Sequence, residues 1–408
     1  MSTADLQAPP VSQLDLHRLR AETPGCAHRC HLNNAGAALM PQPVLDEVRR
    51  HLDLEAQLGG YEAAALAAAE IEATYAAVGA LIGAPPAQVA LVENATAAFA
   101  QALSAVPFER GDVLLTTRAD YVSNQVMFLS LARRLGIEVV RAPDTAAGGV
   151  DVDAVAELLR QRRPRLVSVT HMPTYSGLIQ PVAAIGELCR HHDVLFLVDA
   201  CQSVGQLVVD VRTLGCDFLT ATGRKFLRGP RGTGFLYVSE RVLAAGLEPL
   251  LPDLRGTDWL APDRYVPQPD ARRFENWEFA YALVRGLGAA ARYALEVGLP
   301  QLAERTRSLA DLARRRLAAV PGLQLLDRGP ELGAILTLGL AGREPEELVA
   351  ELRRRGINTS ATHRSSALLE YAERGIDSAL RVSPHYYNSE HELEALAEAL
   401  TELSAAGA

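Results

Sequence analysis

Short apolar runs alternate with segments of helical spacing between about residues 75 and 240. Continuous apolar runs of this length are typical of strands that are buried on both faces of a parallel sheet and covered by helices. The seven runs are QVALVEN (88–94), DVLLTTR (112–118), IEVVRAP (137–143), RLVSVTH (165–171), VLFLVDA (194–200), CDFLTAT (216–222) and GTGFLYV (232–238). The pattern predicts an α/β fold whose large domain contains a mostly parallel seven-stranded sheet.

The pattern changes after this region. Residues 251–273 are rich in proline, aspartate and arginine, have no clear period and are interpreted as an irregular connection. A long helix is predicted over 277–298, followed by a smaller unit with helices at 308–320, 345–356 and 390–407 and a strand at 334–340. The expected parts are an N-terminal arm (1–30), a large domain (31–260) whose first residues pack on the small domain, and a linker helix with a small α+β C-terminal domain (261–408).

The net charge of -9 at pH 7 argues against nucleic acid as a partner. The most apolar long stretch, residues 63–83, carries Glu70 and Glu72 near its middle and is interpreted as an alanine-rich helix of a soluble protein rather than a membrane span. The first twenty residues lack the apolar core of a secretory signal. We therefore expect a cytoplasmic protein that binds neither nucleic acid nor membrane.

The five cysteines are Cys26, Cys30, Cys189, Cys201 and Cys216. They form no regular disulfide framework, as is typical of a reducing compartment. The segment CAHRCH (26–31) has metal-binding residue types, but no second group of ligands follows it downstream. No metal site is predicted.

Lys225 is the only lysine among the 40 lysine and arginine residues. Arginine keeps its proton, whereas a desolvated lysine can lose its proton and attack a carbonyl. A chain that uses arginine wherever charge alone suffices thus points to amine chemistry at Lys225. The alternative is that this lysine is a leftover of an arginine-biased composition.

Other candidate residues follow the predicted strands. Asn94, Ala95 and Thr96 open a helix, where free N–H groups bind phosphate, although simple capping by Asn94 is the alternative. Asp199 ends a very apolar strand, so it is expected to face a cation or donor, such as a protonated pyridine, unless it only caps the turn.

Two further segments complete a set. In RADYVSNQ (118–125), Tyr121 offers a stacking face and Asn124 an amide. In RVSPHYYN (381–388), Arg381 is suited to grip a carboxylate at two points. Taken singly, these are as well explained by a loop aromatic and a surface arginine. A phosphate cradle, a stacking face, a ring acid, an amine and a carboxylate clamp together are the parts of a pyridoxal-phosphate (PLP) enzyme that acts on an amino acid.

The chain also resembles a family, the class V branch of the fold-type-I PLP-dependent transferases. The motifs are HLNNAGAALMP (31–41), GLIQPVAAIGELC (177–189), DACQSVGQ (199–206), GRKFLRGPRGTGFLYV (223–238) and RVSPHYYN (381–388). Most specific is Asp-x-x-Gln, whose Asp199 precedes Lys225 by 26 residues. Cysteine desulfurases, isopenicillin-N-epimerase-like proteins and the carbon-sulfur lyases of ergothioneine synthesis belong to this branch.

The resemblance implies roles for individual residues. Lys225 forms a Schiff base with PLP, Asp199 pairs with the pyridine nitrogen, and Gln202 hydrogen-bonds the ring oxygen. The implied catalytic residues are Lys225, Asp199 and Tyr121; the implied cofactor-binding residues are Asn94, Ala95, Thr96, Tyr121, Asp199, Gln202, Thr222 and Lys225; and the implied substrate-binding residues are Asn34, Thr174, Arg224 and Arg381. The resemblance also implies a homodimer with sites completed across the interface, with Arg273 and Glu275 as contacts from segments 255–259 and 272–277.

Three departures from the family bear on the reaction. Arg224 replaces the usual histidine before the lysine, and Thr174 stands near the position often held by asparagine in desulfurases. Segment 358–388, where persulfide-forming desulfurases carry a nucleophilic cysteine, contains none. We therefore expect a lyase that eliminates the β substituent of a cysteine conjugate or cysteine sulfoxide, such as hercynylcysteine sulfoxide. The alternatives are a class V aminotransferase or epimerase, and a PLP-binding protein without turnover.

Overall fold

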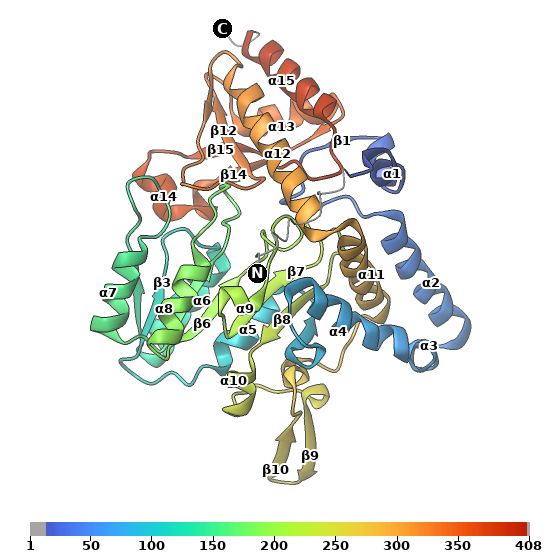
Figure 1. The fold of residues 1–408 in the computed structure, drawn as a ribbon, viewed down its shortest axis with the longest axis vertical. Helices are drawn as coiled ribbons and strands as arrows, with labels where there is room; N and C mark the ends of the chain where they lie inside the picture. The colour runs from blue at the N-terminus through green and yellow to red at the C-terminus, as the bar shows by residue number, and fades with distance from the viewer. Residues whose placement is uncertain (1–13, 406–408) are drawn as a thin grey trace, which may run out of the picture.

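A seven-stranded sheet forms the centre of the larger part of the protein (Figure 1). The computed structural model describes residues 14–405, so residues 1–13 of the predicted arm and 406–408 lie outside the described residues. The strand order is β2-β8-β7-β6-β5-β3-β4, and only β8 runs antiparallel to its neighbours. The strands are β2 (Val89–Val92), β3 (Val113–Thr116), β4 (Glu138–Arg141), β5 (Leu166–Thr170), β6 (Leu195–Asp199), β7 (Phe218–Thr222) and β8 (Gly234–Val238). Each lies within one predicted run, which confirms the α/β fold and its mostly parallel sheet.

Helices cover both faces of this sheet. Phe196 and Val198 of β6 share one core with residues of α4, α7, α8 and α11, whereas Leu197 between them belongs to a second core with α5 and α6. The helices are α4 (Ala68–Ile82), α5 (Ala95–Ala105), α6 (Val122–Leu135), α7 (Val152–Arg162), α8 (Val182–His191) and α11 (Tyr281–Val297). Because successive side chains enter different cores, nearly every strand position must be apolar.

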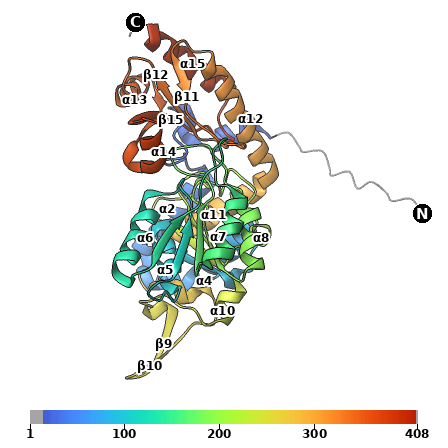
Figure 2. The ribbon, with the colours of Figure 1, turned by 90° about the vertical axis from the view of Figure 1, so that its left-hand side faces the viewer.

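A second, four-stranded antiparallel sheet lies above the first in Figure 2, with the order β11-β12-β15-β14. Its strands are β11 (Leu323–Leu325), β12 (Leu336–Leu340), β14 (Ser360–His363) and β15 (Ser378–Val382), and the helices of this unit are α12 (Leu299–Ala318), α13 (Pro345–Arg354), α14 (Leu368–Glu373) and α15 (Glu390–Ala405). Near the N-terminus, β1 (Cys30–His31) pairs with β13 (Ile357–Asn358), and Leu32 and Ala35 enter the core of this unit. The chain segment that begins near residue 30 therefore packs on the C-terminal sheet.

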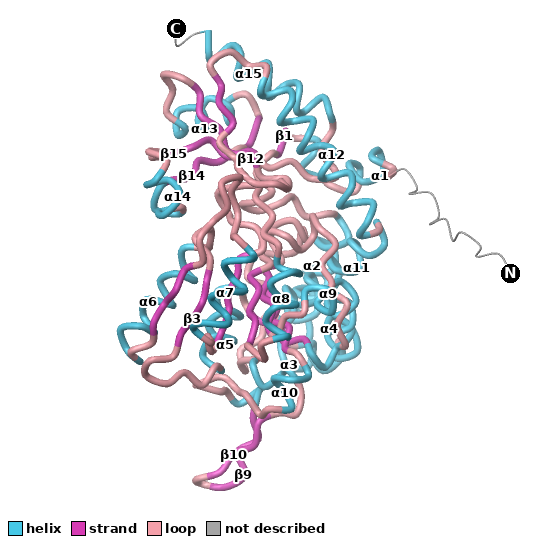
Figure 3. Tube along the Cα trace, turned by 60° about the vertical axis from the view of Figure 1, so that its left-hand side comes forward, coloured by secondary structure: helices cyan, strands magenta, loops and turns pink. Residues whose placement is uncertain are grey.

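Loops rather than helices or strands occupy the level between the two sheets (Figure 3). The loop after β6 approaches the loop after β7 closely at Gly205. This glycine has φ +91°, and a Cβ there would lie 2.3 Å from the carbonyl carbon of Phe226. Only glycine permits this approach, which brings the Asp199 loop against the Lys225 loop.

Two predictions of local structure are corrected. The connection 251–273 contains a protruding hairpin of β9 (Thr257–Ala261) and β10 (Arg264–Pro267), visible at the bottom of Figure 1. Trp259, Leu260, Tyr265 and Val266 are exposed on it, so no one-sided burial imposes a period of two on its sequence. The apolar stretch 63–83 is divided at Ala67 between α3 (Gly60–Leu66) and α4, which meet at 65°.

Within residues 14–405, no single helix has the length and hydrophobicity needed to cross a bilayer, and only the bent pair α3 and α4 passes that test jointly. The remaining helices are α1 (Leu16–Ala21), α2 (Gln42–Leu58), α9 (Val211–Leu214) and α10 (Glu240–Ala244), and the 3-10 turns are Pro24–Ala27, Pro86–Gln88, Leu254–Gly256, Ala271–Phe274 and Arg364–Ser366. The C-terminal helix of the prediction is α15.

Candidate active site

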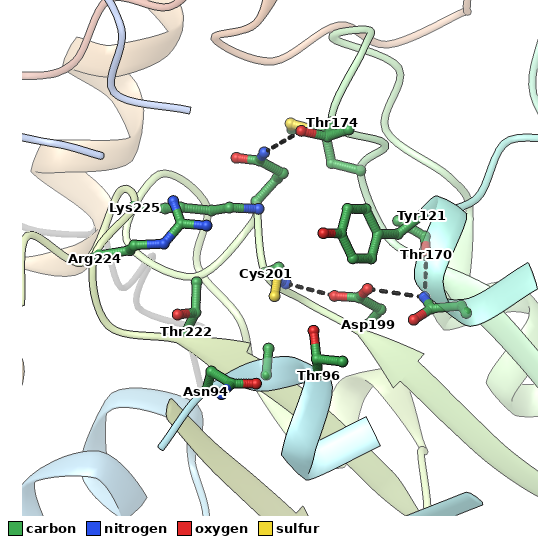
Figure 4. A pocket seen from close by; sticks show the side chains of 14 residues that line it. Asn94, Thr96, Tyr121, Thr170, Thr174, Asp199, Cys201, Thr222, Arg224 and Lys225 are labelled. Atoms are coloured by element: carbon green, nitrogen blue, oxygen red, sulfur yellow. Dashed lines mark hydrogen bonds between the residues drawn. The ribbon is translucent and has the colours of Figure 1, made fainter. Parts of the chain in front are cut away.

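A cavity of about 430 Å³ lies where β2, β3, β5, β6 and β7 end (Figure 4). In open α/β sheets, the carboxyl ends of the strands are where ligands bind. The cavity is lined by Asn94, Ala95, Thr96, Tyr121, Asn124, Thr170, Met172, Thr174, Asp199, Cys201, Gln202, Thr222, Arg224 and Lys225. Every residue that the resemblance implied for cofactor binding is among them.

Asp199 is the last residue of β6 and is only 4% exposed. Each of its oxygens accepts a hydrogen bond: Oδ1 from the backbone N–H of Cys201 at 3.0 Å and Oδ2 from the side chain of Asn124 at 3.0 Å. Figure 4 shows its carboxylate directed into the cavity beside Tyr121. Two donors stabilise the ionised form, so this carboxylate is suited to pair with a protonated ring nitrogen.

Lys225 enters the same cavity from the loop after β7 and is 8% exposed. Burial lowers its pKa, and the positive charges of Arg224 and Arg381 lower it further, against the opposite effects of Cys201 and Asp199. Among residues 14–405, no carboxylate lies within 4.0 Å of its Nζ, which is 6.0 Å from the centre of the Tyr121 ring. The amine is therefore held in surroundings that favour its neutral, nucleophilic form.

The start of α5 supplies an anion cradle. The side chain of Asn94 caps the helix by accepting from the N–H of Ala97 at 2.9 Å, while Asn94, Ala95 and Thr96 also line the cavity. Across from them stands the Thr222 hydroxyl, which donates to the Thr233 carbonyl at 3.1 Å. The helix terminus faces the cavity in an arrangement suited to phosphate. The capping role of Asn94 is confirmed, and phosphate binding at this terminus stays a prediction.

On the opposite side of the cavity, Thr174 links two other predicted residues. Its hydroxyl oxygen accepts from Gln202 at 3.1 Å and from Arg381 at 3.0 Å. The side-chain oxygen of Gln202 is buried and has no partner among the described residues. Burial lowers the pKa of Arg381 to about 10, and the positive charge of Arg224 contributes. Arg381 also donates to Ser360 at 3.1 Å and to Asn33 at 3.3 Å, so its guanidinium is held by β14, by the N-terminal segment and by the loop after β5.

Arg224 lies beside Lys225 in the cavity (Figure 4) and donates to the carbonyl of Gly36. Burial lowers its pKa, as does the charge of Arg231. No carboxylate lies within 4.0 Å of its guanidinium among the described residues. The cavity thus holds more cationic than anionic side chains, a balance that favours anionic ligands.

Three of the predicted residues are buried and absent from the cavity lining. Asn34 is fully buried: it donates to the Ser383 carbonyl at 2.7 Å and accepts from Tyr387. Its neighbour Asn33, which contacts Arg381, is the asparagine of this motif that lies near the site.

Arg273 and Glu275 are likewise engaged inside the chain and are not free to reach a partner. Arg273 is 5% exposed and donates to the carbonyl oxygens of Leu243, Leu247, Gln268 and Pro269. Glu275 is 1% exposed and accepts from Tyr75, Arg255 and the N–H of Leu91. The acidic and basic residue types of RRFENW indicated an interface, but in this segment they serve internal hydrogen bonding.

Sequence reasoning missed part of the site. Asn124 was noted only as an amide, and Asp120, Thr170 and Met172 were not assigned. The spacing of Asp120 and Asn124 could have indicated their contact, because residues four apart at the start of a helix lie one turn apart and their side chains can meet.

None of the cysteines is activated as a nucleophile. Burial raises the pKa of Cys26, raises that of Cys30 to about 12, and raises those of Cys189, Cys201 and Cys216 further. Residues 14–405 contain no group of three or more histidine, cysteine or acidic residues that could hold a metal ion.

The chain matches the aminotransferase class-V family over residues 30–396 and belongs to that family. It is 32% identical over 391 residues to a probable hercynylcysteine sulfoxide lyase of Mycobacterium tuberculosis, covering 95% of this chain and 93% of that protein. It is 31% identical over 336 residues to isopenicillin N epimerase of Streptomyces clavuligerus, covering 79% and 82%, respectively. A cysteine desulfurase of Synechococcus elongatus is 30% identical over 402 residues, and the chain spans 63% of its length.

Among solved structures, cysteine desulfurase CsdA of Escherichia coli superposes with a TM-score of 0.88 at 25% identity, over 97% of this chain and 99% of that one. The resemblance seen in the sequence is thereby confirmed, and the protein is a PLP-dependent enzyme of class V. The residues fit the cofactor: a buried amine without a carboxylate partner, a buried carboxylate with both oxygens oriented, an open helix terminus and an unpaired Gln202 oxygen converge on one cavity. Nε2 of Gln202 donates to Thr174 and to the Ala35 carbonyl, so a hydrogen bond to the ring oxygen would require Nε2 to exchange one of these acceptors for it.

Proposed function

We propose that this enzyme is a carbon-sulfur lyase that eliminates the β substituent of a cysteine conjugate or cysteine sulfoxide, such as hercynylcysteine sulfoxide. The observation that carries the proposal is the state of the thiols. Segment 358–388 has no cysteine, and burial raises the pKa of all five thiols. Transfer of sulfur to the enzyme needs a thiolate, whereas elimination needs a base and an electron acceptor. The likeness to a probable hercynylcysteine sulfoxide lyase supports the same substrate class.

The roles follow from the cavity. Asn94, Ala95, Thr96 and Thr222 hold the cofactor phosphate, Tyr121 stacks on the ring, and Asp199 and Gln202 contact the ring nitrogen and oxygen. When bound, PLP supplies an acceptor for the electrons of the substrate α-carbon. Nζ of Lys225 holds the cofactor and, once released, takes the proton from that carbon. The C–S bond then breaks with its electron pair on sulfur, and the three-carbon remainder takes up water to give pyruvate and ammonia.

Substrate orientation is assigned to the opposite wall. Arg381 is assigned to the α-carboxylate. Ser360 and Thr174 occupy its Nε and Nη1, and Nη2, which donates to Asn33, has one N–H left for the substrate. Arg224, which has a backbone carbonyl as its hydrogen-bond acceptor, is proposed to bind an oxygen-bearing group on the substrate side chain. These two cations would favour a substrate with a carboxylate at one end and a polar, oxygen-rich sulfur substituent at the other.

We further propose that the enzyme acts as a cytoplasmic homodimer. Exposed apolar side chains gather on the β9–β10 hairpin and around the groove formed by Leu52, Tyr61 and Trp277, and burial of such surface favours association. Five free cysteines suit a reducing compartment.

An aminotransferase or epimerase is the second candidate, supported by the family match and the epimerase relative. The same residues serve all three reactions, since each begins with removal of the α-proton. Retention of Lys225 in an otherwise lysine-free chain argues against a PLP-binding protein without turnover.

The experiment is an absorbance spectrum between about 300 and 500 nm, where PLP absorbs, recorded before and after adding S-substituted L-cysteine sulfoxides, beside the Lys225→Ala variant. Stoichiometric pyruvate that the variant does not form supports the lyase. Conversion of the cofactor to its amine form without pyruvate indicates an aminotransferase, and loss of optical activity without pyruvate indicates an epimerase.

A further inference from the structure

Arg228, three residues after Lys225, is 1% exposed and contacts three other parts of the chain. Its Nε donates to the Leu39 carbonyl at 2.9 Å, Nη1 to the Tyr386 hydroxyl at 2.7 Å and Nη2 to the Thr23 hydroxyl at 2.5 Å. Its guanidinium also lies 4.3 Å from the ring centre of Tyr387 and 5.7 Å from that of Tyr293. One side chain thus joins the N-terminal segment, α11 and the segment after β15 to the Lys225 loop.

This guanidinium has no carboxylate within 4.0 Å among the described residues. Removing an arginine from water is costly unless its donors are satisfied, and here neutral oxygens and tyrosine rings replace the usual acid. The backbone of Arg228 is also constrained: φ is +64°, and its N–H donates to the Lys225 carbonyl at 2.9 Å. A leucine would fill the space at lower cost, so the charge and the fork must serve a purpose beyond packing.

A second contact joins the same two segments. Nε2 of His385 lies 2.7 Å from the carbonyl oxygen of Phe226, and the two rings meet edge to face at 5.0 Å. The turn 225–228 and the segment 381–388 are therefore tied at two points. The turn 225–228 begins with Lys225, and the segment 381–388 begins with Arg381, the residue assigned to the substrate carboxylate.

We propose that Arg228 is a positioning residue that holds the Lys225 turn in register with the segment carrying Arg381, so that a substrate meets the amine and the clamp simultaneously. This inference rests on the proposed function, which assigns the substrate carboxylate to Arg381. The planar fork suits the task because its three nitrogens donate to Leu39, Tyr386 and Thr23 in fixed directions. Displacement of either segment by a fraction of an ångström weakens binding of the carboxylate by Arg381.

The test compares binding of L-alanine, which has the amine and carboxylate but no leaving group, with binding of ethylamine, which lacks the carboxylate. Dissociation constants are taken from the absorbance change of the PLP-loaded enzyme. The variants are Arg228→Met, Tyr386→Phe and Arg381→Met. The matched control is Arg273→Met, since Arg273 is also buried but donates only to carbonyl oxygens outside the site. Thermal unfolding of each cofactor-free protein separates loss of stability from loss of register.

Arg228→Met is expected to raise the dissociation constant of L-alanine by about tenfold, as for a misplaced charge-assisted contact. The dissociation constant of ethylamine should not change. Tyr386→Phe, which removes one hydroxyl, is expected to raise the dissociation constant of L-alanine by about threefold. This variant provides the test if Arg228→Met does not fold. Arg273→Met lowers the unfolding temperature without changing the preference for L-alanine. In the Arg381→Met background, Arg228→Met has no further effect on that preference.

The inference is overturned if Arg381→Met abolishes the preference while Arg228→Met and Tyr386→Phe change only stability, as the control does. If Arg381→Met leaves the preference intact, the carboxylate assignment of the proposed function fails, and the inference that depends on it fails too. The two failures are therefore distinguishable.

Discussion

Asp120 and Asp199 share one donor: Nδ2 of Asn124 lies 3.0 Å from Oδ1 of Asp120 and 3.0 Å from Oδ2 of Asp199. Burial raises the pKa of Asp120, while hydrogen bonds from Thr170, Gln125 and Asn124 act against that shift. Because both neighbours of the amide are acceptors, Asn124 must present its NH₂ group to them. Asp120 thereby fixes the orientation of the group that holds Asp199.

Replacement of Asn124 by alanine should reduce kcat by about tenfold or more, as is common when a partner of a ligand-holding carboxylate is removed. Asp199 then loses the donor on Oδ2, which weakens its ionised form and its pairing with the ring nitrogen. Steady-state kinetics and the dissociation constant of PLP provide the measurement. Gln125→Ala is the control, because Gln125 donates to Asp120 at 2.8 Å but does not contact Asp199. Equal losses in both variants would contradict the role assigned to Asn124.

The stability of the cofactor-free protein should depend on Lys225 in a defined direction. Since burial lowers its folded-state pKa, the unfolded chain binds this proton more readily, and stability rises with pH from the lowered pKa up to the unfolded value of about 10.4. The free energy of unfolding of the wild type, relative to Lys225→Met, should therefore increase across that window and level off above it. Urea unfolding at several pH values measures this difference; a constant or decreasing difference would show that the amine is not desolvated.

Arg224→Gln should shift the pH dependence of PLP loading upward. Burial lowers the pKa of Lys225 most, and the charge of Arg224 lowers it further, so removing that charge raises the pKa. The loading rate depends on the neutral amine, and its midpoint should move toward that of an ordinary lysine. Stopped-flow absorbance after mixing cofactor-free protein with PLP follows the reaction. Arg231→Gln, an exposed arginine outside the cavity lining, should leave the midpoint in place.

Cys201 is the one cysteine in the cavity lining, and its replacement by alanine should leave pyruvate formation within about threefold of the wild type, as for a small, buried and un-ionised side chain. Iodoacetamide should likewise fail to inhibit the native enzyme. Pyruvate is measured with a coupled dehydrogenase. A loss of activity by orders of magnitude in either experiment would favour sulfur transfer through a thiol.

Glu275→Ala should lower the free energy of unfolding by about 3 kcal/mol, the size expected when one partner of a buried ion pair is removed. The substitution leaves Arg255, Tyr75 and the Leu91 N–H without their shared acceptor. Denaturant unfolding gives the value. Glu72→Ala breaks an exposed pair with Arg272 and should cost less than about 1 kcal/mol. A Glu275 variant of normal stability but altered association would instead support the interface role predicted from the sequence.

The strands of the large sheet and the position of the site could be predicted from local sequence. Burial on both faces demands continuous apolar runs, and Tyr121, Asp199 and Lys225 each follow such a run closely. The β9–β10 hairpin could not be predicted. Its apolar side chains are exposed, so its sequence shows no alternation of apolar and polar residues. Residue type alone does not distinguish internal hydrogen bonding, as at Arg273 and Glu275, from an interface.

By itself, the sequence determined the fold class and the family, because these depend on periodicity and on the order of motifs along the chain. Only the tertiary structure decided which asparagine faces the site: Asn33 pairs with Ser383 in an isolated bridge, and since neighbouring side chains point to opposite sides, Asn34 is directed into the interior. The tertiary structure alone also revealed the cluster around Arg228, whose side chain donates to Thr23, Leu39 and Tyr386, each more than 150 residues away in the sequence. Contacts of this kind arise from the packing of whole elements, which no local pattern records.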